Sequence, residues 1–452
     1  MKKYIYIICV LFLAVSCFDD DTEFGNNKLS EISLKKGIED NYLKEKQETL
    51  SITPEIEQSI EGRQLKYEWF VNYSLVSNEK DLEYTCDTLG DLDCYLKVSN
   101  DDDVFYHDFK LKVISPYEQG LFVLSSTASK SMLSFRRNDK DNASFVKEVF
   151  KLNNPGYTLG SKALTMASVD EDYIMISTGS PSKIVTIDTK TLEINNVVDN
   201  PDETMEDIQT ITNAGQNIYA TMIGKGKVFG YSPKDSRFWT FLSEYLPVTD
   251  ASFNNRTFYL WGTDGDTNGQ IFYDDAYKQI RWFSPYFRYE DLSNAAFPNY
   301  DLLDMLPCDK SANVMLLMKD ADSKLKLIRY SAQEDIILSE LDVTSTTLTE
   351  GSIYMVHPQK PILYYNKGNK IYRYNYLSSS LPTEESPFVT VDGTVSKFLF
   401  SPDGDKFYVA YQDNSTELSG CVTCFDADSR NIIWSEKNIA GDIEALLYRK
   451  AS

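Results

Sequence analysis

Val395-Ser-Lys-Phe-Leu-Phe400 leads into a Ser401-Pro-Asp-Gly404 turn, and three more strand-like runs follow it. These runs are Lys406 to Tyr411, Gly420 to Phe425 and Asn431 to Trp434. Each is rich in aromatic and β-branched residues, and Gly, Pro, Asp, Asn or Ser separates it from the next run. That pattern is typical of strands joined by tight turns. The stretch therefore predicts one set of four short strands.

The same rhythm of four runs can be followed back towards Gly120. The earlier sets begin at Leu164, Ile208, Val248, Leu302 and Ser352. In the set that starts with Val248 to Phe253, we expect the second strand at Thr257 to Trp261. No helical period of apolar residues persists in this region, so a helical solenoid is the poorer alternative.

The first set is one strand short. Gly120 to Leu124, Met132 to Phe135 and Phe145 to Phe150 supply only three runs, and Asp442 to Tyr448 follows the seventh set with nothing after it. We therefore predict an all-β chain whose residues 116–452 form a β-propeller closed by the C-terminal strand. Seven four-stranded blades at about 47 residues each fit this pattern, and six or eight blades remain alternatives. The signatures of WD and kelch repeats are absent.

The amino terminus resembles a bacterial lipoprotein signal peptide. Met1-Lys-Lys3 is positive, Tyr4 to Val15 is apolar but short for a membrane span, and Ala14-Val-Ser-Cys17 places small residues before a cysteine. The resemblance implies that residues 1–16 are removed and that Cys17 carries lipid. Ala14 stands where the family usually has leucine. An ordinary signal peptide with an incidental cysteine is the alternative.

Residues 17–28 form an acidic tether. Phe18-Asp-Asp-Asp-Thr-Glu23 cannot build a core. It resembles the acidic run that directs lipoproteins of Bacteroidota to the cell exterior, which implies an outer-membrane protein that faces outwards. A plain acidic linker on a lipoprotein that faces the periplasm is the alternative. The formal net charge of the chain is -23, with 68 acidic and 45 basic residues, so nucleic-acid binding is not expected.

Residues 29–115 show longer, alternating strands. Tyr67-Glu-Trp-Phe-Val71 alternates, and Val104 to Ile114 reads as one long strand. We predict a small immunoglobulin-like β-sandwich in which Trp69 packs between the two sheets.

Several of its segments resemble the PKD-like lipoproteins of Bacteroidota, in which an immunoglobulin-like domain precedes a propeller-type region. These segments are Tyr67-Glu-Trp69, Leu82 to Gly90, Tyr95-Leu-Lys-Val-Ser-Asn100, and Phe109 to Glu118 running into Gly120-Leu-Phe-Val-Leu-Ser125. Members are often encoded beside a TonB-dependent transporter and its lid lipoprotein, a nutrient-uptake pair of the starch-utilisation type. The resemblance implies a surface accessory subunit and identifies neither a ligand nor catalytic residues.

The cysteines predict no metal site. Cys86 and Cys94 flank the turn from Asp87 to Asp93, and they form a disulfide if the strand register turns their Cβ atoms towards each other. Cys421 and Cys424 lie three residues apart on a predicted strand and point to opposite faces, so a zinc site is not expected. We expect no cofactor.

Asp264-Gly-Asp-Thr-Asn-Gly269 matches the start of a calcium loop. Its candidate ligands are Asp264, Asp266 and Asn268, with Asp275 at the twelfth position where glutamate is usual. The alternative is a hairpin turn rich in glycine and aspartate.

Acidic residues near the predicted inner strands are the candidates for catalysis. Asp250, Asp304 and Glu444 come from different blades and could converge at the channel, as the two carboxylates of a glycosidase would. Acids of this kind more often hold water in a polar channel.

Aromatic residues near the predicted rim are the candidates for ligand binding. They are Trp261 and Trp282, with Tyr286 and Tyr289 in the polar connection from Pro285 to Pro298. Packing between blades is the alternative for each. We expect a non-enzymatic binding or scaffold protein that holds a glycan, a peptide or a partner lipoprotein close to a nutrient-uptake system. A propeller glycoside hydrolase and a purely structural subunit are the rival interpretations.

Overall fold

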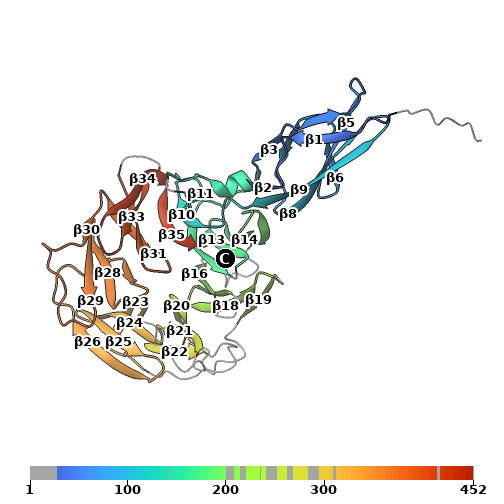
Figure 1. Cartoon of the computed structure of the whole chain (residues 1–452). Helices are drawn as coiled ribbons and strands as arrows, with labels where there is room; N and C mark the ends of the chain where they lie inside the picture. The colour runs from blue at the N-terminus through green and yellow to red at the C-terminus, as the bar shows by residue number, and fades with distance from the viewer. Residues whose placement is uncertain are drawn as a thin grey trace, which may run out of the picture. The chain divides into compact units, whose positions relative to one another are not determined.

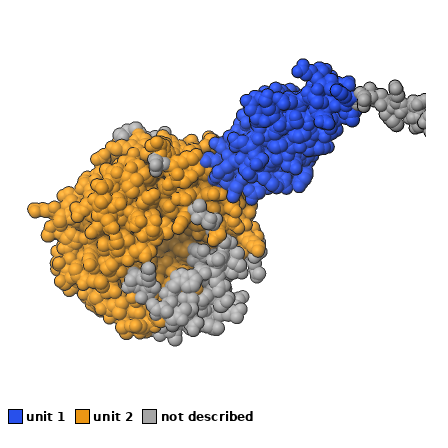
Figure 2. Space-filling view, viewed as in Figure 1, with its two compact units in different colours: residues 1–115 blue, residues 116–452 orange. Residues whose placement is uncertain are grey.

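The computed structural model describes residues 28–140, 142–169, 171–199, 208–213, 220–234, 236–240, 252–261, 268–283, 295–308, 312–414 and 418–450. The chain divides into two compact units, Met1–Ser115 and Pro116–Ser452, which Figure 2 colours blue and orange. Within the described ranges the elements are strands, apart from a short helix, α2 (Val149–Asn153). No helix in these ranges is long and apolar enough to span a membrane.

The first unit is a β-sandwich. Its strands are β1 (Ile32–Lys36), β2 (Asn41–Glu45), β3 (Thr49–Ile52), β4 (Glu55–Gln58), β5 (Lys66–Val71), β6 (Ser74–Ser77), β7 (Leu82–Thr85), β8 (Gly90–Ser99) and β9 (Val104–Ile114). One layer is a five-stranded sheet in the order β2-β9-β8-β5-β6, and β1-β4 and β3-β7 form two smaller sheets. Apolar side chains alternate with outward-facing polar ones along β8, so one face of the sheet packs into the core.

Trp69 lies in the centre of this core, as the sequence predicts. Its side chain is fully buried among residues of both layers, and its indole N–H donates a hydrogen bond to the Glu79 carbonyl at 3.0 Å. The predicted disulfide between Cys86 and Cys94 is not present, and both thiols are free and buried. Cys86 follows β7, which pairs with β3, whereas Cys94 lies on β8 in the five-stranded sheet. They are therefore not on paired strands of one sheet, as the disulfide prediction assumed.

These two thiols should be inert in the folded protein. Burial raises the pKa of the Cys94 thiol to about 11 and also raises the pKa of Cys86. Because the thiolate is the reactive form, we expect iodoacetamide to label neither residue at neutral pH and to label both in strong denaturant. Peptide mass spectrometry after labelling measures this. Detection of peptides linked by a Cys86–Cys94 disulfide in a digest of the folded protein would contradict the structure.

The second unit contains seven sheets in its described residues. The strands of the first sheet are β10 (Gly120–Ser126), β11 (Ser131–Arg137) and β35 (Asp442–Arg449). The next two sheets are β12 (Ala163–Val169), β13 (Tyr173–Gly179), β14 (Ser182–Asp188), β15 (Ile194–Asp199), then β16 (Ile208–Asn213), β17 (Ala220–Gly224), β18 (Lys227–Ser232), β19 (Arg237–Thr240). The fourth and fifth are β20 (Phe253–Trp261), β21 (Asn268–Asp274), β22 (Gln279–Phe283), then β23 (Tyr300–Cys308), β24 (Asn313–Asp320), β25 (Leu325–Ser331), β26 (Ile336–Asp342). The last two are β27 (Tyr354–Val356), β28 (Ile362–Lys367), β29 (Lys370–Asn375), β30 (Val389–Thr390), then β31 (Thr394–Phe400), β32 (Lys406–Gln412), β33 (Gly420–Asp426), β34 (Ile432–Ala440).

These sheets follow one another around a ring, the arrangement of a β-propeller (Figure 1). The C-terminal strand β35 pairs antiparallel with β10, from Gly120 opposite Arg449 to Ser126 opposite Asp442. The predicted closure by the C-terminal strand is therefore confirmed. Cys421 and Cys424 lie on β33 in two different hydrophobic clusters, which agrees with their predicted orientation to opposite faces.

One predicted strand is wrong, and another begins earlier than predicted. Phe145 to Phe150 forms only an isolated bridge between Val146 and Phe135 before helix α2 begins. In the fourth sheet, the second predicted strand, Thr257 to Trp261, lies within β20, and most of the first, Val248 to Phe253, lies outside the described residues. β20 begins at Phe253, before the predicted start at Thr257, and its pairing with β21 is irregular between Phe253 and Thr257.

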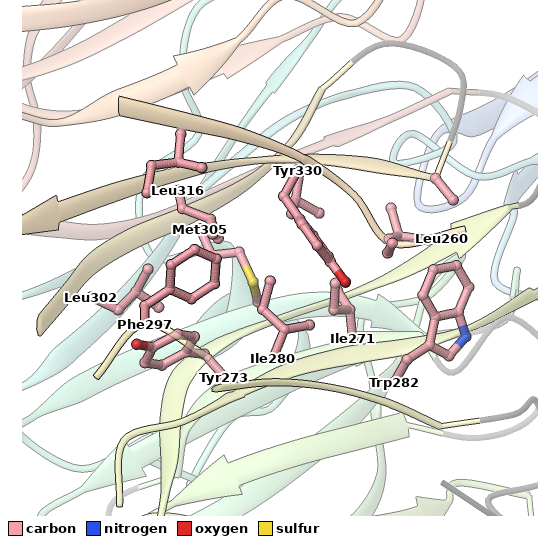
Figure 3. Close-up of a cluster of buried hydrophobic side chains, with 14 of the residues drawn as sticks. Leu260, Ile271, Tyr273, Ile280, Trp282, Phe297, Leu302, Met305, Leu316 and Tyr330 are labelled. Atoms are coloured by element: carbon pink, nitrogen blue, oxygen red, sulfur yellow. The ribbon is translucent and has the colours of Figure 1, made fainter. Parts of the chain in front are cut away.

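Packing between neighbouring sheets supplies the core of the second unit. Figure 3 shows one such cluster, formed by the sheets of β20–β22 and β23–β26, with Ile271, Ile280, Leu316 and Tyr330 in contact across the interface. Trp282 belongs to this cluster and is only 3% exposed. The predicted role of Trp282 in ligand binding at the rim is therefore wrong, because its ring is buried between the two sheets.

Candidate functional site

The inner strand of each sheet faces a central channel. These strands are β12, β16, β20, β23, β27, β31 and β35, and each packs against the next until β35 meets β12. We use the name central channel for the space that they enclose. Figure 2 shows the second unit hollowed near the middle of the face in view. Two cavities, of about 330 and 790 Å³, are lined by residues of these strands, and Arg256 and Lys397 belong to the walls of both.

Irregular pairing on the inner strands turns polar residues towards the channel. The register shifts between Phe253 and Thr257 on β20, between Leu302 and Asp304 on β23, and between Val395 and Lys397 on β31. On β35 it shifts so that Glu444 is skipped. A β-bulge breaks the strict alternation of a strand and re-aims a side chain. In this way strands whose other residues fill the core also present charges to the channel.

Arg256 and Asp304 form an ion pair in the channel wall. The Arg256 Nε lies 2.8 Å from the Asp304 Oδ1, with the Asp304 side chain 8% exposed and the Arg256 side chain 54% exposed. The backbone N–H of Met305 also donates to Asp304 Oδ1, at 2.8 Å. Burial raises the pKa of the Asp304 carboxyl, and the Arg256 guanidinium opposes that shift. Asp304 is thus held in place from two sides.

Lys397 and Glu444 form a second, looser group. Burial lowers the pKa of the Lys397 ammonium, while the carboxylates of Glu444 and Asp304 oppose that shift. Burial likewise raises the pKa of Glu444, against the effect of Lys397. Among the described residues, the side chain of Lys397 has these electrostatic neighbours, but its ammonium group forms no hydrogen bond or ion pair. The channel therefore contains a half-buried cation without a direct partner in the described part of the chain.

Two of the three acids considered as candidates for catalysis, Asp304 and Glu444, line the channel. Asp250 lies outside the described residues. The sequence pattern did not indicate the two cations, Arg256 and Lys397, as channel residues. The polar residues Asn254-Asn-Arg256 inside an otherwise apolar run were the available signal, since they mark the irregular stretch of β20 rather than a turn.

Two of the four predicted calcium ligands, Asn268 and Asp275, do not lie together. Asp264 and Asp266 lie outside the described residues, as does the side chain of Asn268. Asn268 begins β21 and Asp275 directly follows its last residue, so the two lie roughly 23 Å apart at about 3.3 Å per residue. Asp275 instead accepts a hydrogen bond from the Asn254 amide at 3.2 Å. The set of four ligands is therefore wrong. No group of three or more potential metal-binding side chains occurs in the described ranges.

The remaining aromatic candidates are not placed by the structure. The side chain of Trp261, and both Tyr286 and Tyr289, fall outside the described residues. With Trp282 buried, the channel charges are the better-supported site.

Comparison with known protein families gives a match in the amino-terminal part of the chain. Residues 17–162 match the PKD-like family. This PKD-like domain includes β1–β9, and the match continues into β10 and β11 of the propeller. No curated protein gave a significant match to the chain.

Solved structures resemble the chain at low identity. A quinonprotein alcohol dehydrogenase-like protein from Bacteroides thetaiotaomicron has 14% identity and a TM-score of 0.51, over 94% of this chain and 100% of that one. The periplasmic gluconolactonase of Pseudomonas aeruginosa has 12% identity and a TM-score of 0.51, over 74% of this chain and 99% of that one. These similarities establish a propeller-like fold that follows the PKD-like domain in the chain. They do not establish any chemical activity.

Proposed function

We propose that this protein is a non-enzymatic, lipid-anchored binding protein of the bacterial cell surface. Its PKD-like domain acts as a spacer, and its propeller holds a ligand or a partner close to a nutrient-uptake complex. Such a protein raises the local concentration of the ligand without breaking bonds in it. The signal-like residues 1–16, Cys17 and the acidic run that follows support the anchor and its outward orientation.

One observation favours binding over hydrolysis: the acids in the described channel wall are accompanied by cations. Asp304 is paired directly with Arg256, and Glu444 is influenced by Lys397. A glycosidase needs one carboxyl group that donates a proton and a second that acts as a nucleophile or a base. A carboxylate fixed by a guanidinium and a backbone N–H is poorly suited to either role. The channel is better suited to hold a polar ligand.

The hydrolase remains the rival proposal, because Asp304 and Glu444 share one channel and burial raises the pKa of both. Release of reducing ends from a polysaccharide by the purified protein, lost in Asp304→Asn, would establish that rival.

The resemblance to PKD-like lipoproteins of Bacteroidota supports a role beside a TonB-dependent transporter and its lid lipoprotein. The test is a pull-down of the lipidated protein from its native membranes in mild detergent, with mass spectrometry of the proteins recovered. We expect the transporter and its lid lipoprotein in the eluate. Cys17→Ala is the matched control, because it lacks the sulfur that would carry the lipid and should leave the membrane fraction. Recovery of the protein alone would reject the accessory-subunit role.

A further inference from the structure

Lys397 and Arg256 present two cations to one part of the channel in a strongly acidic protein. Both side chains belong to the walls of both cavities. The Arg256 guanidinium binds Asp304 through Nε at 2.8 Å, while its Nη2 is 3.5 Å from the same carboxylate. With 54% of its side chain exposed, Arg256 retains N–H groups that can reach a ligand.

The Lys397 ammonium is the group that indicates an anionic ligand. It is half-buried, and within the described chain it has charged neighbours but no direct hydrogen-bond acceptor. A desolvated charge without such an acceptor is unfavourable, and an anion that binds it recovers part of that cost. The carboxylates of Glu444 and Asp304 balance the charges of the two cations, so this part of the channel has no excess charge that would attract an anion. An anion would bind there through direct contacts with the two cations.

The rest of the wall is suited to hydroxyl groups. Gln209 and Asn255 line the smaller cavity with exposed amide side chains that have no side-chain hydrogen bonds within the described residues. Amide groups both donate and accept, as sugar hydroxyls do. The cavity volumes of about 330 and 790 Å³ lie in the range of small-molecule sites.

We propose that the central channel binds an acidic sugar, with its carboxylate or sulfate group between Arg256 and Lys397 and its hydroxyl groups on Gln209 and Asn255. This inference rests on the proposed binding function and specifies the class of its ligand. A uronic acid and a sulfated sugar carry the same recognition chemistry, so the experiment must separate them.

Calorimetric titration of the full chain tests the proposal with three probes: trigalacturonate, its fully methyl-esterified form and a singly sulfated galactose disaccharide. We expect binding of at least one anionic probe, and at least tenfold weaker binding of the neutral ester. Binding of trigalacturonate alone assigns a uronic acid, and binding of the disaccharide alone assigns a sulfated sugar. Lys397→Met should weaken the anionic probe roughly ten- to hundredfold, the range for a hydrogen bond to a charged group.

Two variants make this result specific. Lys397→Arg keeps the charge and should retain most of the affinity, which a mere loss of packing would not predict. Lys437→Met is the matched control. Lys437 is an exposed lysine on the outer strand β34 and forms an ion pair with Asp392, so this variant should bind the probes like the wild type. The thermal midpoint of each variant checks folding.

The outcomes separate this inference from the proposed function. Equal affinity for the acid and its ester, or full affinity in Lys397→Met, would overturn the acidic-sugar assignment and leave a binding protein. Failure to bind any probe would also overturn the assignment, while the pull-down decides the proposed function independently. Cleavage of a probe would instead overturn the non-enzymatic function.

Discussion

Removal of residues 442–452 should abolish folding of the propeller while the PKD-like sandwich stays folded. β35 is the inner strand of the first sheet, and its loss leaves one edge of β10 unpaired. Leu121, Phe122, Val123 and Leu124 on β10 are all fully buried. β35 also packs against β12 and β31, so its loss removes the contacts that close the ring. An unpaired edge with apolar faces promotes aggregation.

Limited proteolysis and thermal unfolding measure this effect. We expect the truncated chain to lose the thermal transition of the propeller and to give a protected fragment that ends near Ser115, where the first unit ends. Removal of residues 451–452 alone is the control, because it leaves β35 intact. A propeller transition at the same temperature in both truncations would show that closure by β35 is not required.

The sequence predicted the strands best where the local pattern and the final environment agree. In the set from Val395 to Trp434, strands alternate with turns rich in Pro, Asp and Gly, and the observed strands β31–β34 begin within one residue of the predicted ones. The closing strand could be predicted because the first set lacked a strand and the C-terminal run had no set of its own. That prediction follows from the assumption that the blades form a closed ring, which the local sequence of a single strand does not reveal.

The segment from Phe145 to Phe150 shows where the local pattern is ambiguous. Its buried residues are Phe145, Val149 and Phe150, a spacing that fits one helical turn as well as a short strand. Phe145 packs edge-to-face on Trp434 at 5.9 Å, and its backbone N–H donates to Glu436. These contacts join residues almost 300 positions apart in the chain, so tertiary packing decides the local structure here.

The channel site was only partly predictable for a related reason. A bulge interrupts the alternation of a strand and hides where the strand begins, so the sequence predicts a strand only from Thr257, after Asn254-Asn-Arg256. The bulges on β20, β23 and β31 carry or adjoin Arg256, Asp304 and Lys397, and they arise from pairing between strands. Sequence pattern therefore identified the acids as channel residues but could not show that cations accompany them.

Asp274→Ala should lower the free energy of unfolding of the propeller by about 3 kcal/mol, the lower end of the cost of breaking a buried ion pair. The Asp274 side chain is fully buried and its Oδ2 lies 2.8 Å from Nε of Arg281, which is 5% exposed. The Oδ1 atom accepts the backbone N–H of Ala276 at 3.0 Å and of Ser252 at 3.2 Å. The carboxylate thus joins the β21–β22 turn to the start of β20. The lower end applies because the Arg281 guanidinium also lies 5.5 Å from the centre of the Tyr277 ring.

Urea denaturation followed by tryptophan fluorescence measures this loss, since Trp282 lies on β22 beside the ion pair. Asp274→Asn should have an intermediate effect, because an amide oxygen still accepts backbone hydrogen bonds but does not neutralise Arg281. Asp322→Ala is the matched control: Asp322 and Lys324 form a pair whose side chains are 76% and 75% exposed, and exposed pairs contribute at most about 1 kcal/mol. If Asp274→Ala costs no more than Asp322→Ala, the buried pair does not hold this blade together. The stability of the fourth sheet would then depend on its other contacts, with the third and fifth sheets.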